Sequence, residues 1–138
     1  MTGQQLDTMT GKPMIFVFGS NLAGAHGAGA AKVAREKHGA VIGVGYGPTG
    51  DAYAIPTKDR NIRTMSKDPI RYYVGEFKKY AASHPDLEFQ VTRIGCGLAG
   101  YSDRDIAPMF KDAPMNCLFD TAWKPWFERT HRFWGHVA

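Results

Sequence analysis

The chain has 138 residues, of which 43% are hydrophobic and 22% charged, and its formal net charge is +4. A chain of this length can bury one proper core, and no apolar run approaches the roughly 20 residues of a membrane-spanning helix, which excludes a membrane-embedded protein. We expect a loose leader over residues 1–13 and a single domain over residues 14–138. The basic residues are spread along the chain, which favours a small anionic ligand over extended nucleic-acid contact.

The two cysteines, Cys96 and Cys117, cannot form a disulfide framework, and their flanking residues are typical of buried strands. We therefore expect free thiols and a cytoplasmic protein. The histidines show no metal-ligand spacing with one another or with the cysteines, so no metal site is predicted. Cys96 follows a glycine whose loop would expose amide groups to a thiolate, but a buried and inert thiol is favoured because no partner histidine is assignable.

The segment that organises the chain covers residues 14–33. An apolar run at 14–18 predicts a buried strand, a glycine-rich loop follows, and the alanine-rich residues 28–37 predict a helix. Backbone N–H groups and the positive end of a helix then face one small space, which suits a phosphate. The alternative is that these glycines only make tight turns.

Further segments alternate between strand and helix patterns. Residues 40–51 predict a short extended piece and then a mobile loop, and residues 52–57 a short strand that ends near Pro56. Asp68 and Pro69 are typical of a helix start, and apolar residues at three- and four-residue spacing continue that helix until His84 and Pro85.

The last third of the chain holds a second glycine loop, residues 94–101, after a predicted strand at 87–94. Ser102 opens a short helix with an acidic first turn, and residues 116–119 predict a last strand. Residues 123–134 combine three tryptophans with basic residues. These residue types would suit base stacking in a nucleic-acid complex, although terminal tryptophans more often close a core or an oligomer interface.

Alternating strands and helices predict a three-layer α/β domain with a mostly parallel sheet. Ligands of such sheets bind beyond the carboxyl ends of the strands, where both glycine loops and Lys58 would lie. Neither loop is followed by Gly-Lys-Ser or Gly-Lys-Thr, and neither reads as a dinucleotide fingerprint. An NTPase and a nicotinamide dehydrogenase are therefore disfavoured.

Three blocks in this order give a more specific comparison: residues 27–31 (Gly-Ala-Gly-Ala-Ala), residues 53–58 (Tyr-Ala-Ile-Pro-Thr-Lys) and residues 93–98 (Arg-Ile-Gly-Cys-Gly-Leu). Together they resemble the macrodomain family, most closely its lysine-dependent branch, the terminal ADP-ribose protein glycohydrolases. The resemblance implies a macrodomain-like α/β/α sandwich with a mixed sheet whose cleft binds ADP-ribose. It also implies removal of ADP-ribose from protein, nucleic-acid ends or small esters without a metal, and it names no cofactor.

The resemblance assigns roles to particular positions. Lys58 matches the catalytic lysine, whose neutral amine attacks the anomeric carbon of the ribose, and burial would favour that neutral form. The alternative interpretation is that Lys58 is a solvated lysine at the end of a strand. The positions implied in ligand binding are Ser20, Asn21, Gly27, Ala28 and Gly29 on the first loop, and Gly95, Cys96, Gly97, Leu98, Ala99, Gly100 and Tyr101 on the second.

The chain also departs from the branch. Ala99 stands where the catalytic aspartate is expected, so Asp103 and Asp59 are the substitute candidates. The alternative role of Asp103 is to cap a helix, and that of Asp59 is to lie in a solvated turn. No early Gly-Asp element for adenine is found, and Asp7 is a poor substitute. Two hypotheses follow: a glycohydrolase or esterase acting on ADP-ribosylated substrates, and a module that binds ADP-ribose or an NAD-derived nucleotide without turnover.

Overall fold

A six-stranded sheet forms the centre of the computed structural model, which describes residues 5–136. Its strands lie in the order β2-β3-β1-β4-β5-β6. They are β1 (Met14–Asn21), β2 (Gly47–Thr49), β3 (Ala52–Lys58), β4 (Glu88–Val91), β5 (Cys117–Asp120) and β6 (Arg132–Gly135). Neighbours are parallel except for β2 and β3, which are antiparallel. The predicted α/β class with a mostly parallel mixed sheet is confirmed.

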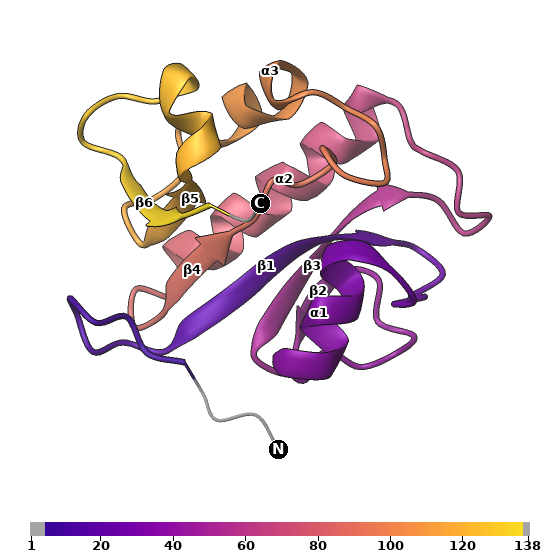
Figure 1. Cartoon of the computed structure of the whole chain (residues 1–138), viewed down its shortest axis with the longest axis horizontal. Coiled ribbons are helices and arrows are strands. Elements are labelled where there is room, and N and C mark those ends of the chain that lie inside the picture. The colour runs from indigo at the N-terminus through magenta and orange to yellow at the C-terminus, as the bar shows by residue number, and fades with distance from the viewer. Residues whose placement is uncertain (1–4, 137–138) are drawn as a thin grey trace.

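Helices cover both faces of this sheet (Figure 1). They are the α-helices α1 (Gly29–Lys37), α2 (Lys67–Ala82) and α3 (Asp103–Ile106), and the 3-10 helices η1 (Ala107–Phe110) and η2 (Thr121–Trp126). Side chains alternate along a strand, so Phe16 and Phe18 of β1 pack with α1 while Ile15 and Val17 pack in the larger core with α2. No helix within residues 5–136 is long and apolar enough to cross a membrane.

The predicted helices exist, and one boundary is wrong. Helix α1 matches the predicted 28–37 within one residue. Helix α2 begins at Lys67 with Ser66 at the N-cap position, so Asp68 lies inside the first turn and is not the cap. The buried stripe of α2 contains Ile70, Val74, Phe77 and Ala81, as the spacing predicts.

Strand β3 does not end near Pro56 but continues to Lys58. Strand β2 pairs only with residues 52–54, so the outer side of β3 is open at Pro56, where a residue without an N–H is tolerated. The predicted loop at 40–51 contains β2, because the chain turns back onto β3 at residues 50–51, where Gly50 takes a φ of +57°. These three residues of β2 carry no alternating pattern.

The sequence prediction is less accurate beyond α2. Strand β4 is shorter than the predicted 87–94, since the Thr92 carbonyl accepts from the Ile94 amide at 2.8 Å and the chain turns away from the ladder there. Strand β5 is shifted by one residue, and β6 is not predicted. Trp123 is fully buried, and the Trp134 Nε1 donates to the Val91 carbonyl at 2.8 Å. These two tryptophans therefore close the core rather than present rings for base stacking.

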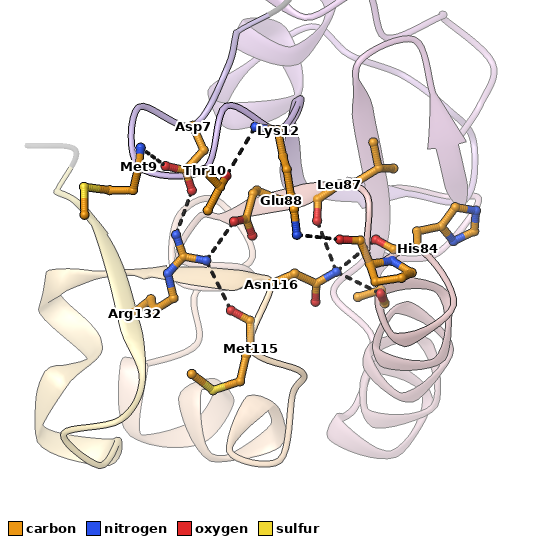
Figure 2. A network of polar contacts seen from close by, with 12 residues as sticks. Asp7, Met9, Thr10, Lys12, His84, Leu87, Glu88, Met115, Asn116 and Arg132 are labelled. Carbon is orange, nitrogen blue, oxygen red and sulfur yellow. Dashed lines mark hydrogen bonds and ion pairs between the residues drawn. The ribbon is translucent and has the colours of Figure 1, made fainter.

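The described part of the predicted leader, residues 5–13, is held against the amino ends of the strands (Figure 2). Asp7 is 4% exposed and accepts from Arg132 of β6 at 2.7 Å, and Arg132 also donates to the buried Glu88 of β4 at 2.9 Å. Lys12 donates to the Pro85 carbonyl. Asp7 lies at the opposite end of the sheet from the glycine loops and is not available to read a base there.

Candidate functional site

A cavity of about 850 Å³ opens at the carboxyl ends of β1, β3, β4 and β5, the end that the α/β topology predicts. Eleven of the predicted site residues line it: Ser20, Asn21, Gly27, Ala28, Gly29, Lys58, Gly95, Cys96, Gly97, Leu98 and Ala99. Asp59, Gly100, Tyr101 and Asp103 are not among its lining residues. The structure thus brings both glycine loops and Lys58 to one space.

The first wall is the loop between β1 and α1, and Asn21 fixes its shape. The Asn21 side chain donates to the Ala25 carbonyl at 2.8 Å and accepts from the Ala25 amide at 3.0 Å. Gly24 has a φ of +72°, and a Cβ there would lie 2.3 Å from the Gly43 carbonyl carbon, so no other residue fits. Asn21 acts in the structure as the residue that closes the loop.

His26 is a buried residue of this loop and packs between the loop and β1. It is 3% exposed, its Nε2 lies 3.2 Å from the Val44 carbonyl, and its ring meets Phe18 edge-on. Burial lowers the pKa of His26, so the ring is neutral near pH 7. A neutral ring beneath the loop adds no positive charge to the site.

The amino end of α1 presents unused amide groups to the cavity. The N-cap residue Ala28 offers no side-chain acceptor, and the first turn contains no acidic residue. The N–H groups of Gly29, Ala30 and Ala31 therefore have no partner within residues 5–136, and all three residues line the cavity. Such a helix end carries a partial positive charge and attracts an anion.

The second wall is the loop after β4. The amides of Cys96, Gly100 and Tyr101 are used inside the loop, on the carbonyls of Arg93, Gly97 and Gly95. The N–H groups of Gly97, Leu98 and Ala99 donate no hydrogen bond within the described part of the chain. Leu98 lies against Gly29 of α1, so this second set of amides belongs to the same cavity as the first.

Lys58 ends β3 and is half-buried at the cavity. The neighbouring Asp59 is turned into its own loop, where its Oδ1 accepts from the Asn61 and Arg63 amides at 2.8 and 3.0 Å. This geometry is that of a turn residue. Asp59 is therefore not directed at the atom that Lys58 would attack.

Asp103 is the partner of Arg93, a residue not singled out from the sequence. Arg93 donates to both carboxylate oxygens from Nε and Nη2 at 2.8 Å, and the Trp123 Nε1 donates to Asp103 Oδ1 at 2.8 Å. The Arg93 guanidinium holds the pKa of Asp103 below its usual value. Arg93 itself lines the cavity, so Asp103 serves to position a cation there.

Both cysteines are free thiols. Cys96 does not lie in or beside a buried strand, as its flanking residues predicted, but belongs to the second glycine loop. Burial raises the pKa of Cys96 to about 12, with Asp103 adding to that effect. Burial likewise raises the pKa of Cys117 in β5 to about 12. A thiol that stays protonated at neutral pH is a poor nucleophile.

Asp120 is the one carboxylate that borders the cavity among residues 5–136. It is 1% exposed and accepts from the Ala122 amide and from His136 Nδ1, both at 2.8 Å. It stands on β5, three strand positions from β3 and thus roughly 14 Å from the end that carries Lys58. Asp120 cannot act on the same atom as Lys58.

A second hollow, of about 620 Å³, lies between α2 and η1. One of its two lysines, Lys78, is already engaged by Asp112 at 2.6 Å and by the Met109 carbonyl. No glycine loop borders it, and no group of three His, Cys, Asp or Glu in the described chain could hold a metal. The candidate functional site is therefore the cavity between the two glycine loops.

No protein-family model matches this chain, and none of the curated proteins is similar to it. The fold is similar to a solved structure described as a protein of unknown function from Bacteroides thetaiotaomicron. The two chains are 16% identical, the match covers 86% of this chain and 94% of the other, and the TM-score is 0.51. This similarity concerns the fold alone.

Proposed function

We propose that the chain binds ADP-ribose or a related nucleotide carrying a diphosphate, in the cavity between the two glycine loops. The observation that carries the proposal is the pair of unused amide sets, residues 29–31 and 97–99, that border one cavity. The first-turn amides of α1 have no partner within the helix, and a second set of unpaired loop amides at the same cavity makes an arrangement that suits an anion. The resemblance of the three sequence blocks to macrodomains supports the choice of ADP-ribose.

Binding without turnover is the form of this function that the site supports best. Within residues 5–136, no carboxylate lies beside Lys58 at the cavity: position 99 is an alanine, Asp59 faces its own loop and Asp103 is paired with Arg93. General acid or base assistance to an attack by Lys58 therefore has no evident source. Hydrolysis of an ADP-ribosyl linkage remains the second candidate, favoured by the place of Lys58 at the cavity.

Isothermal titration of the full chain with ADP-ribose tests the proposal. Gly97→Asp is the most informative variant, because a Cβ at Gly97 meets nothing within 4 Å and its φ is not positive. The added carboxylate would repel a diphosphate and lower the affinity by about tenfold or more. Gly97→Asn, which has the same shape without the charge, is the matched control and keeps most of the affinity.

The two forms of the function are separated by incubation with ADP-ribosylated protein and ADP-ribosylated nucleic acid. A binding module releases no ADP-ribose from either. Release that is lost in Lys58→Ala, with ADP-ribose affinity retained, would instead establish the hydrolase. Absence of any heat with ADP-ribose would refute both forms.

A further inference from the structure

Ile62 lies at the cavity in a backbone conformation that its side chain disfavours. Its φ is +61°, the single positive φ among the non-glycine residues described. A β-branched residue is a true outlier in this region, which is unfavourable for every residue that carries a Cβ. Ile62 is nevertheless 45% exposed, so burial of its side chain in the core does not offset that cost.

The loop around Ile62 is built to hold this conformation. The Asp59 carboxylate accepts from the Asn61 and Arg63 amides on either side of Ile62, and the Ile62 amide donates to the Asp59 carbonyl at 3.1 Å. Thr64 then ties the loop to the second glycine loop through the Ala99 carbonyl at 3.0 Å. Strained residues that are fixed in this way are concentrated at functional sites.

Two more aliphatic side chains stand exposed at the same cavity. Leu98 is 67% exposed and Val33 is 37% exposed, and both line the cavity together with Ile62. They come from three separate elements: the β3–α2 loop, the second glycine loop and α1. Val33 is one helical turn beyond Gly29, the residue against which Leu98 lies, so these two side chains share one side of the opening.

We propose that Ile62, Leu98 and Val33 contact the flat face of a nucleobase that belongs to the same ligand as the anion. This inference rests on the proposed function and names the part of the ligand that the amides do not explain. A cavity of about 850 Å³ is larger than a diphosphate needs, and its mouth is aliphatic while its amides are polar. Aliphatic side chains cover a ring without reading its edge, so bases of different kinds bind with similar affinity.

Titration with ADP, UDP and inorganic pyrophosphate tests this inference on the intact chain. We expect ADP and UDP to bind with affinities within about threefold of each other, and pyrophosphate to bind about tenfold or more weakly, because it lacks a ring. The decisive variant is Ile62→Gly. It removes the side chain and the backbone strain together, so the melting temperature stays equal or rises by roughly 2 °C while ADP affinity falls about fivefold.

If Ile62→Gly lowers ADP affinity without lowering the melting temperature, Ile62 contacts the ligand and does not merely stabilise the fold. Ile42→Gly, which removes a 62% exposed isoleucine away from the cavity, is the matched control and leaves ADP affinity unchanged. Unchanged ADP affinity in Ile62→Gly, or equal losses for ADP and pyrophosphate, would overturn the inference while the anion site stands. Failure of the unaltered chain to bind any of the three probes would remove the proposed function and this inference together.

Discussion

At the scale of single residues, the pair of Arg93 and Asp103 holds a cation at the cavity for which we propose an anionic ligand. Asp103 is occupied by two bonds from Arg93 and one from the buried Trp123. The Arg93 Nη1 donates no hydrogen bond within residues 5–136, and Arg93 lines the cavity. A cation held in one orientation at the cavity adds positive charge to that of Lys58, the other basic residue among its lining residues.

Asp103→Asn is expected to lower stability by about 1 kcal/mol near neutral pH, a modest value because Arg93 is partly exposed. The folded state lowers the pKa of Asp103 below 3.8, so the pair stabilises the fold above that pH. Its contribution is lost as the pH falls through the folded-state pKa. Urea unfolding of both proteins between pH 2 and pH 7 measures the difference, which converges at low pH.

The matched control for this pH series is Asp86→Asn, since Asp86 is exposed and its side chain makes no hydrogen bond within residues 5–136. It leaves stability within a few tenths of a kcal/mol across the same pH range. A pH-independent loss in Asp103→Asn would contradict the assigned ion pair.

Cys96 provides a second test at the residue scale. Burial raises its pKa to about 12, so the thiol stays protonated at pH 8. We expect iodoacetamide at pH 8 to leave the native chain unmodified while both cysteines react in urea. Rapid alkylation of Cys96 in the native chain would show that the thiol is activated. Mass spectrometry of the digested protein locates the modification.

The sequence motifs predicted which residues reach the cavity better than they predicted the role of each side chain. The glycines and Lys58 reach the cavity because they follow strands in a parallel sheet, and that position is visible in the sequence. The tasks of Asn21, Asp59 and Asp103 depend on side-chain directions that spacing does not encode. Arg93 was missed because it directly precedes the glycine loop and no short pattern distinguishes it from a surface arginine.

At the scale of elements, β6 and residues 5–13 depend on each other through Arg132 (Figure 2). Arg132 pairs with Asp7, 4% exposed, and with Glu88, 1% exposed. Burial opposes ionisation of Asp7, but the Met9 amide and Arg132 outweigh it, and the pKa of Asp7 lies below 3.8. A segment that reads as a polar leader is thus held to the last strand of the sheet.

Arg132→Met leaves two buried carboxylates without their cation and is expected to cost about 3–5 kcal/mol at pH 7. The cost shrinks as the pH falls through the pKa of Asp7, because a protonated carboxyl no longer needs the cation. Chemical denaturation at pH 7 and pH 3 measures this. The exposed Arg129→Met is the control, and equal losses in the two variants would contradict the account.

Two strands and one short helix were missed by sequence interpretation. Strands β2 and β6 have three and four residues, and neither carries apolar and polar residue types in alternation. Each forms because its neighbour, β3 or β5, offers an open edge, which is tertiary information. Helix α2 was predicted because three- and four-residue spacing of apolar residues is a local signal, whereas the 3-10 helix η2 was not predicted.

At the scale of the whole molecule, the α/β class and the position of the site follow from alternating segments. One core lies between α2 and the sheet and a smaller one between α1 and the sheet, the two helices covering opposite faces (Figure 1). The loops at the carboxyl ends of the strands are left to form the cavity. The ligand is not determined by this arrangement, because folds of this class bind many compounds. Only the groups that line the cavity argue for an anion carrying a ring.

The most direct test of the central claim is an amide-resolved NMR titration of the labelled chain with ADP-ribose. Amide protons that gain a bond to a phosphate oxygen shift to lower field. We expect the amides of Ala30, Ala31, Gly97 and Leu98 to shift together, with one common dissociation constant. Shifts confined to other parts of the chain, or absent at saturating ADP-ribose, would contradict the claim that the two glycine loops bind one anion between them.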